Sequence, residues 1–419
     1  MTYVDTAMVG HLGEKATASV STTTSIIWLI SSLPYAFSVG LMAMVSRSYG
    51  AQKTDNLNKL AALSVKATLI FGTLITFLSV GLAPFIPGWM NAAAEIQHDA
   101  AVYFAIISIP SLFKVASVFF GTCLQAVKDT KTPMIINLSS NVLNVFLNAL
   151  FIYGLSMGVK GAAIASGISF GAGGIVMTIV FFRRKEFGNI KTGLKQKNDI
   201  CLIKEVSAIA IPALLTSLVS CTSHVVFTAM VSGMGTTIFA AHSIAIGAEE
   251  LFYLPGYGLR TATSTLVGIA IGENKPDKLK TVKHQSIFIT ITMMIFTGIL
   301  LFIFSTPLMK LFTSSCEVAK LGAQMLKIVA FSEPFFGLTI VWEGICYGLG
   351  KAKRIFIIES FSMWGIRILS TYIVINILNL GLKEVWYCMI LDNIFKALML
   401  TLINLISVPE KNLRSGFFS

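Results

Sequence analysis

The chain has 419 residues, of which 55% are hydrophobic and only 12% are charged, and its mean hydropathy is +0.77. Since soluble globular domains carry about 25% charged residues, this composition excludes a soluble protein and indicates a polytopic membrane protein. The net charge of +12 comes from basic residues in short loops between long apolar segments, a pattern that encodes membrane topology and does not favour nucleic-acid binding.

An acidic residue stands near the start of the chain, where a membrane helix should be apolar. Asp5 lies in the stretch MTYVDTAMVG, which ends by Gly13. With a rise of about 1.5 Å per residue, this segment extends roughly 15 Å from Met1 and is too short to span a bilayer. We therefore expect a first helix with a truncated start. Ionisable groups inside a membrane are usually functional, so Asp5 is the leading candidate residue.

Eleven further segments are apolar over the roughly 20 residues that a membrane helix needs. They lie near residues 22–45, 60–86, 100–127, 133–153, 161–182, 206–231, 239–271, 286–304, 319–348, 355–378 and 385–408. Together with the Asp5 segment, they predict an all-α polytopic membrane protein with about 12 transmembrane helices.

Basic residues gather in alternate loops, for example around Arg47, Lys128 and Lys351. The positive-inside rule places these loops in the cytoplasm, and both termini with them. The longest basic loop falls midway along the chain and is the expected boundary between two domains. The predicted parts are an N-terminal six-helix lobe at 1–182, a basic cytoplasmic linker at 183–199, a C-terminal six-helix lobe at 200–408 and a cytoplasmic tail at 409–419.

The second half of the chain repeats the first at an offset of about 222 residues. The early DTAMV stretch returns as Phe227–Val231 without its acid, and Gly13 returns as Gly235. Further matches are Leu33-Pro34 with Leu254-Pro255, Gly50 with Gly272, Gly121 with Gly344, and Cys123 with Cys346. Two six-helix halves have the same orientation, and such parallel repeats commonly place transport sites near the bilayer midplane. The matched prolines, Pro34 and Pro255, are candidate helix bends.

Four asparagines mark one face of the predicted helix at 133–153. They are spaced by four, three and four residues, which places their amides on one narrow face. They are Asn137, Asn141, Asn144 and Asn148. Hydrogen bonds between helices, at ~0.6 kcal/mol each, would explain one or two of them. Four in register near an acid favour a hydrated polar chamber, so we expect these amides to line a transport cleft.

Lys114 stands in the middle of the apolar stretch IPSLFKVASVFF, where a lysine is costly. Its aliphatic stem would allow the ammonium group to reach an interface. Alternatively, Lys114 pairs with Asp5 or lines the cleft. The sequence leaves these interpretations open.

Four stretches in order along the chain resemble the multidrug and toxic compound extrusion (MATE) transporters of the bacterial type. They are VDTAMVGHLG, QAVKDTKTP, NVLNVFLNALFIYG and LPGYGLRTATSTLVG. The resemblance covers essentially the whole chain. It implies two six-helix lobes that form a V-shaped cleft, alternating access, and export of cationic or amphipathic compounds in exchange for protons or sodium ions.

The resemblance also implies a setting for the protein. We expect a monomer in the inner or plasma membrane, with small organic cations and the lipid bilayer as its partners and no nucleic acid. No cofactor is expected beyond H⁺ or Na⁺ as the coupling ion.

The same resemblance implies a coupling-ion site built from Asp5, Asn144, Asn148 and Ser166. In family members whose amino-terminal lobe binds the ion, the position of Asn148 holds a second acid, so one carboxylate is missing here. A proton needs only Asp5, whereas Na⁺ could be held by Asp5, Asn144 and Asn148. The coupling ion therefore stays open, and no other metal site is expected. In the second half, Glu249 matches an acidic position before the LPG turn and is a further cleft candidate.

Other charged residues lie in the apolar segments of the second half. The acids are Glu343, Glu359 and Asp392, and the bases are Arg260 and Arg367. Ion pairs that hold the lobe together would explain them, and recognition of a cationic substrate is the alternative.

Two other functions are alternatives to an antiporter for this sequence. A lipid-linked oligosaccharide flippase of related architecture would need a strongly cationic cleft, to which Lys114, Arg260 and Arg367 could contribute. An intramembrane enzyme would need a nucleophile with its base, or a metal cluster, and the sequence shows no such constellation. We therefore expect a protein that is not an enzyme.

Overall fold

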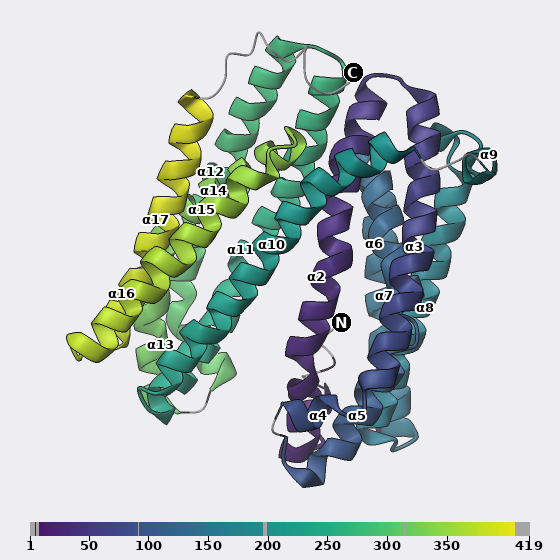
Figure 1. Ribbon diagram of the computed structural model, residues 1–419. Coiled ribbons are helices and arrows are strands. Elements are labelled where there is room, and N and C mark those ends of the chain that lie inside the picture. Colours follow the sequence, from purple (N-terminus) through teal and green to yellow (C-terminus); the bar gives the residue numbers. More distant parts are fainter. Residues whose placement is uncertain (1–4, 6–7, 91, 196–198, 314, 407–419) are drawn as a thin grey trace. The chain divides into compact units, whose positions relative to one another are not determined.

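The computed structural model describes residues 5, 8–90, 92–195, 199–313 and 315–406. Within these residues the secondary structure is helical, and the chain divides into two compact units, residues 1–207 and 208–419. The first unit runs from purple to teal and the second from teal through green to yellow in Figure 1.

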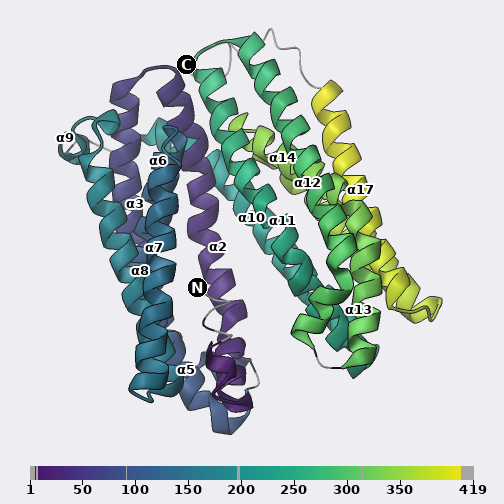
Figure 2. The ribbon, with the colours of Figure 1, turned by 180° about the vertical axis from the view of Figure 1, so that it is seen from behind.

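Unit 1 contains long helices joined by short connections. Asp5 and residues 8–10 are helical, and the elements that follow are α2 (Glu14–Gly50), α3 (Thr54–Leu82), α4 (Ile86–Trp89), α5 (Ala94–Ser108), α6 (Ser111–Ala126), α7 (Lys131–Asn148), the π-helix η1 (Ala149–Gly154), α8 (Gly158–Arg183), the 3₁₀-helix η2 (Lys185–Phe187) and α9 (Ile190–Lys195). Helix α8 lies beside α6 and α7, as Figure 2 shows.

Small residues on α8 explain this close packing. A Cβ atom added to Gly174 would lie 2.2 Å from the carbonyl oxygen of Phe113 on α6. A Cβ atom added to Gly173 would lie 2.4 Å from the Ser140 hydroxyl on α7. Glycines at such contacts are typical of membrane helices, because they let two backbones approach closely. This packing brings polar groups of α7 and α8 within hydrogen-bonding distance.

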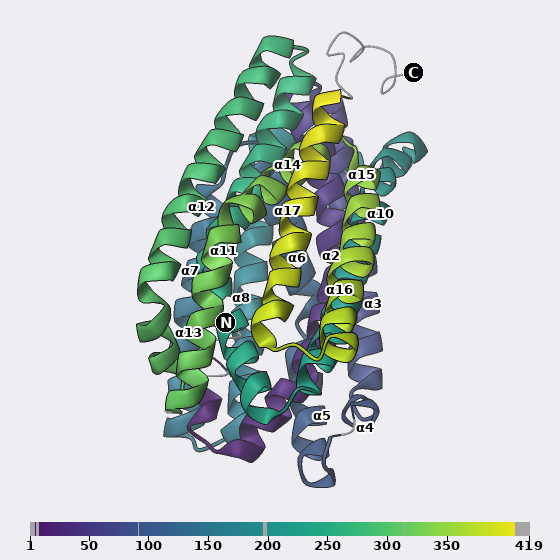
Figure 3. The ribbon, with the colours of Figure 1, turned by 90° about the vertical axis from the view of Figure 1, so that its left-hand side faces the viewer.

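Unit 2 repeats the pattern. Its elements are α10 (Ile200–Ser232, which starts before the division between the units), α11 (Thr236–Gly272), α12 (Pro276–Phe312), α13 (Cys316–Val329), the 3₁₀-helix η3 (Ala330–Ser332), α14 (Glu333–Gly348), α15 (Ala352–Phe361), the π-helix η4 (Ser362–Ile368), α16 (Leu369–Tyr372), the π-helix η5 (Ile373–Ile377) and α17 (Leu382–Ile406). Helix α11 contacts α12, α13 and α14 (Figure 3).

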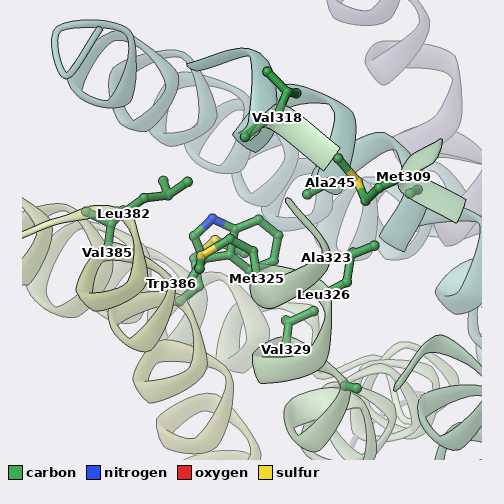
Figure 4. Packing of buried hydrophobic residues seen from close by; sticks show 14 of the residues in the cluster. Ala245, Met309, Val318, Ala323, Met325, Leu326, Val329, Leu382, Val385 and Trp386 are labelled. Atoms are coloured by element: carbon green, nitrogen blue, oxygen red, sulfur yellow. The ribbon is translucent and has the colours of Figure 1, made fainter. Parts of the chain in front are cut away.

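The core of unit 2 forms around an aromatic side chain. Trp386 of α17 is fully buried and lies among Met325, Leu326 and Val385 (Figure 4). Its indole Nε1 donates a hydrogen bond of 3.2 Å to His242 Nδ1 on α11. Since a buried indole N–H needs an acceptor, this bond fixes α17 against α11.

The backbone shows the same duplication as the sequence motifs. Gly13 (φ 112°) precedes α2 and Gly235 (φ 117°) precedes α11, and both helices have 37 residues. Positive φ values favour glycine at these two starts. Positive φ also recurs at Ser156 and Asn379, which follow the π-helices η1 and η5. The predicted repeat is therefore present in the local geometry as well as in the residues.

The eleven predicted spanning segments each correspond to one helix or to a series of consecutive helices. Eight helices of the described part of the chain are long and apolar enough to cross a membrane, and α5 with α6, bent by 48°, makes a ninth. Together with the remaining helices, the fold agrees with the all-α architecture of roughly 12 transmembrane helices. Pro34 and Pro255 lie inside continuous helices, α2 and α11, and the bends at these residues stay a prediction.

The predicted linker at 183–199 contains helical segments. Residues 183–195 include η2 and α9, which pack against α3. The predicted domain limits stay predictions, and the tail at 409–419 lies outside the described residues.

Candidate functional site

Asp5 is buried in unit 1 and accepts two short hydrogen bonds. Its exposed fraction is 2%. Ser166 Oγ of α8 donates to Asp5 Oδ2 at 2.6 Å, and Asn148 Nδ2 of α7 donates to Asp5 Oδ1 at 2.6 Å. Both donors are neutral. The carboxyl group is thus solvated by hydrogen bonds without being paired to a cation among its described neighbours.

The donors to Asp5 are linked to one another. Asn144 Nδ2 donates to Ser166 Oγ at 2.9 Å, and Asn148 Nδ2 also lies 3.4 Å from Asn144 Oδ1. All three side chains are fully buried. The structure therefore brings together the four residues that the family resemblance assigns to the coupling-ion site, although their role in coupling stays a prediction.

Apolar side chains surround this network. Val9, which lies one helical turn after Asp5, packs with Tyr103, Ile152 and Val159. A low-dielectric surrounding strengthens every polar interaction inside it and makes an unsatisfied group costly. The Asp5 site is therefore a place where binding one cation would change the local energy strongly.

Local backbone features support the site. Helix α7 ends at Asn148 and continues directly into the π-helix η1, and π-helical turns occur frequently at functional sites. Tyr153 of η1 donates a hydrogen bond of 3.0 Å from its hydroxyl to the carbonyl oxygen of Met8. This bond ties η1 to the segment that carries Asp5.

One polar atom of the network has no partner. Asn148 Oδ1 is buried and accepts no hydrogen bond, although such an atom normally has a partner. It is an oxygen beside a carboxylate, and oxygen atoms are the ligands of hard cations. Among the described residues no group of three or more His, Cys, Asp or Glu side chains could hold a metal ion. The partnerless oxygen of Asn148 and the carboxyl group of Asp5 are therefore the acceptor groups that this site offers.

Asn137 and Lys114 lie outside the Asp5 network. Asn137 is exposed, and Asn141 is half-buried. Lys114 Nζ donates to Ser31 Oγ of α2 at 3.3 Å and lies 5.2 Å from the centre of the Phe170 ring. It therefore lies inside unit 1 and does not pair with Asp5.

In unit 2, Glu249 of α11 is buried near a second acid. The carboxyl groups of Glu249 and Glu333 are close enough to interact electrostatically. Glu333 begins α14, has an exposed fraction of 1%, and neither of its carboxyl oxygens has a hydrogen-bond partner. Two ionised carboxylates in such a place would be costly.

The other acids and bases that the sequence analysis singled out in the apolar segments of unit 2 form ion pairs. Arg260 Nη1 lies 2.7 Å from Glu343 Oε2. Asp392 Oδ2 lies 2.8 Å from Arg367 Nη2 and 3.0 Å from Lys396 Nζ. Of the two interpretations that the sequence left open, this geometry agrees with ion pairs that hold the lobe together.

The remaining acid of this group belongs to the same network. Glu359 Oε2 lies 3.6 Å from Lys396 Nζ, and Ser220 donates a hydrogen bond of 3.2 Å to Glu359 Oε1. All the acids and bases that the sequence analysis singled out in the apolar segments of unit 2, except Glu249, are thus paired with a base or an acid.

Two charged residues of unit 2 were missed in the sequence. Lys396 lies four residues after Asp392, and this i,i+4 spacing is a signal for a helical ion pair. Glu333 precedes Pro334 in an apolar stretch. An acidic residue in such a stretch is the signal by which the sequence could have identified it. Neither spacing could reveal that Glu333 lies beside Glu249.

Comparison with known proteins extends the similarity beyond motifs. A sequence profile of the MatE family matches residues 1–150 and 212–373. The chain is 29% identical to the probable multidrug resistance protein NorM of Thermotoga maritima, over 97% of this chain and 88% of that protein.

Two solved structures share the fold at 21% identity, each over 99% of this chain and 92% of the other. One is a MATE protein in complex with MaD3S, with a TM-score of 0.92. The other is a MOP superfamily transporter from Pyrococcus furiosus, with a TM-score of 0.91, whose binding pocket is described as having reverse polarity.

Proposed function

The chain belongs to the MatE family, and we propose that it is a secondary active antiporter that exports small organic compounds in exchange for H⁺ or Na⁺ by alternating access. The relative from Thermotoga maritima is named as a probable multidrug resistance protein, which supports amphipathic organic cations as the first substrates to test. The observation that carries the proposal is the buried carboxyl group of Asp5, held by neutral donors.

Among the described residues only neutral donors contact Asp5, and none of them compensates its charge. Burying an unpaired charge is costly. The binding of a proton or a sodium ion therefore removes the large free-energy cost of burying the ionised carboxyl group. Ser166 and Asn148 must then change the hydrogen bonds that they donate. A ligand shifts a conformational equilibrium only as far as its affinities for the two states differ, and this rearrangement supplies such a difference.

The segment after Asn148 is placed to respond to the ion. Asn148 is the last residue of α7, and η1 begins with the next residue. A change in the hydrogen bonds of Asn148 therefore acts at the junction of an α-helix and a π-helix. We propose that ion binding at Asp5 changes the packing of this junction and thereby lowers the affinity of unit 1 for the substrate.

Either ion can be bound by the same side chains. A proton on Asp5 could be donated to Oδ1 of Asn148 after a rotation of the amide group, since that oxygen has no partner. A sodium ion could be held by oxygen atoms of Asp5, Asn144, Asn148 and Ser166. The two ions are the two outcomes of the experiment below.

Paired charges in unit 2 argue against the flippase alternative. Arg260 and Arg367 are matched by Glu343 and Asp392, which leaves little positive charge there for a pyrophosphate group.

We place the protein in the plasma membrane with both termini in the cytoplasm, because the basic loops lie on one side of the predicted helices.

The test is efflux of a fluorescent organic cation from proteoliposomes that contain the full chain. A proton gradient and a sodium gradient are imposed separately, for the wild type, Asp5→Asn and the matched control Asp99→Asn. Asp99 is an exposed acid of α5. We expect one gradient to drive efflux in the wild type and the control, and efflux to fall to background in Asp5→Asn.

The variant keeps the shape and one acceptor of Asp5, so its thermal unfolding should stay close to that of the wild type. Unchanged efflux in a folded Asp5→Asn protein would contradict the proposal. Activity without any gradient would contradict secondary active transport itself.

A further inference from the structure

A cavity of about 50 Å³ lies inside unit 1, apart from the hydrogen bonds of Asp5. Residues of α2, α3, α5 and α6 line it, at the place where α5 and α6 meet with a bend of 48°. Its apolar lining consists of Ile27, Ile30, Pro34, Ile75, Phe104, Ile107, Val115 and Val118. Its polar lining consists of Lys114 and four serines, Ser31, Ser79, Ser108 and Ser111.

The charge of this cavity is positive. Lys114 is the charged residue of the lining, and none of the other lining residues is an acid. Its described contacts are with the Ser31 hydroxyl and the Phe170 ring, which are neutral. A lysine inside a membrane protein is normally paired. The structure thus presents an ammonium group that lacks a carboxylate partner among the described residues.

The serines add further donors. The hydroxyl groups of Ser79, Ser108 and Ser111 make no hydrogen bond to another described residue, and the three side chains are largely buried. Their exposed fractions are 3%, 6% and 7%. Ser111 also begins α6, and helix starts favour negative charge. An ammonium group, free hydroxyl donors and a helix start all suit an anionic group.

We propose that this cavity, the Lys114 cavity, binds the carboxylate group of an amphipathic molecule whose hydrocarbon part lies along the isoleucine and valine lining. One ammonium group matches one negative charge, and a cavity of this size suits a group as small as a carboxylate. As a statement about substrates, this proposal rests on the proposed transport function. It adds carboxylate-bearing amphiphiles to the compounds that the protein would transport.

The proposal is tested by the binding of three probes of equal chain length, octanoate, octylamine and octanol, to the purified full chain by calorimetry. We expect octanoate to bind at least about tenfold more tightly than octylamine or octanol, because a charge-assisted bond is lost in each of the latter. Equal binding of all three probes would overturn the proposal, since the cavity would then recognise only hydrocarbon.

Variants locate the binding at the cavity. Lys114→Gln should weaken octanoate binding by about tenfold, Lys114→Arg should retain it, and Ser79→Ala should weaken it by about threefold. Lys160→Gln removes an exposed lysine of α8 and is the matched control. Ser79→Ala keeps every charge and tests the site if Lys114→Gln does not fold. Octanoate binding that is unaffected by Lys114→Gln and Ser79→Ala would overturn the proposal.

Efflux measurements separate the source of the ligand and the two proposals. Octanoate that an ion gradient drives out of proteoliposomes is a transported molecule, whereas octanoate that binds without efflux stands for a lipid carboxylate; both support the cavity as the site. If the wild type binds octanoate but shows no ion-driven cation efflux, the antiporter proposal is refuted and the Lys114 cavity stands. If it shows ion-driven cation efflux but does not bind octanoate, only the cavity proposal is refuted.

Discussion

Equivalent positions of the two repeats hold opposite chemistry. Asp5 of unit 1 corresponds to Phe227 of unit 2. Ser156 and Asn379, which follow η1 and η5, are 223 residues apart, and with this offset Asn144 corresponds to Arg367. In unit 1 a carboxyl group accepts hydrogen bonds from amide and hydroxyl groups, whereas in unit 2 the Arg367 guanidinium lies 5.8 Å from the centre of the Phe227 ring.

The difference concerns how charge is compensated. Arg367 and Lys396 both contact Asp392, and Lys396 also contacts Glu359, so two positive and two negative charges balance within this cluster. In the part of the chain that the structure describes, the donors to Asp5 are neutral. A balanced cluster holds helices together, while an unbalanced charge is available for an ion. We therefore expect substitutions in unit 2 to change stability and substitutions in unit 1 to change coupling.

The largest expected effect comes from breaking the balanced cluster. Asp392→Ala leaves Arg367 and Lys396 buried without their shared partner, and we expect the free energy of unfolding to fall by about 3–5 kcal/mol. Thermal unfolding of the purified chain measures this. The matched change in unit 1, Asp5→Asn, should cost less than about 1 kcal/mol because no cation of the described residues is paired with Asp5. Equal losses would remove the contrast between the two units.

The second prediction concerns a donor to Asp5. Ser166→Ala removes a hydrogen bond to a charged group, worth about 1.5–3 kcal/mol, and should change the ion concentration for half-maximal efflux about tenfold. With Na⁺ as the coupling ion a ligand is lost, so this concentration rises. With H⁺ the ionised carboxyl group loses a donor, so it falls. Ser166→Thr keeps the hydroxyl group and is the control; an unchanged ion dependence in Ser166→Ala would show that the bond plays no part in coupling.

The third prediction tests Glu333, a buried acid that forms none of the ion pairs described above. Glu333→Gln removes a buried acid whose oxygens have no donor, and we expect the free energy of unfolding to stay equal or to rise by about 1 kcal/mol. In Glu343→Gln, by contrast, Arg260 loses the charge of its partner, and stability should fall. Destabilisation by Glu333→Gln as large as that by Glu343→Gln would show that Glu333 is compensated after all.

The smallest effect is expected where the repeats differ at the surface. Ala51 follows α2, and the residue at the same place after α11 is Glu273, which accepts a hydrogen bond of 2.6 Å from Lys278 Nζ. The Lys278 ammonium group holds the pKa of Glu273 below its usual range. A carboxyl group with a lowered pKa in the folded state stabilises the fold above its usual pKa, and this contribution is lost as the pH falls through the folded value.

Glu273→Ala should therefore reduce stability at neutral pH by less than about 1 kcal/mol. The difference from the wild type should disappear in acid, below the usual glutamate pKa of about 4.3. Unfolding midpoints measured across this pH range check both statements, and a difference that grows in acid would contradict the assignment.

The sequence by itself determined the membrane architecture and the duplication. Apolar length and the repeated motifs are local properties, and each predicted spanning segment has its counterpart among the helices. The spacing of Asn144 and Asn148 also placed both amides on one helix face, because the helical period relates sequence separation directly to direction. Family resemblance added Ser166 and assigned these residues, with Asp5, to one site.

The tertiary structure alone decided which polar groups meet. Asp5 and Ser166 are 161 residues apart in the chain and come into contact because α8 packs closely against its neighbours. Packing also excluded Asn137 from the network, turned Lys114 toward Ser31, and set Glu333 beside Glu249. Periodicity specifies the face of a helix on which a residue lies, but the group opposite that face depends on how separate helices pack. Residue spacing within one helix carries no record of that packing.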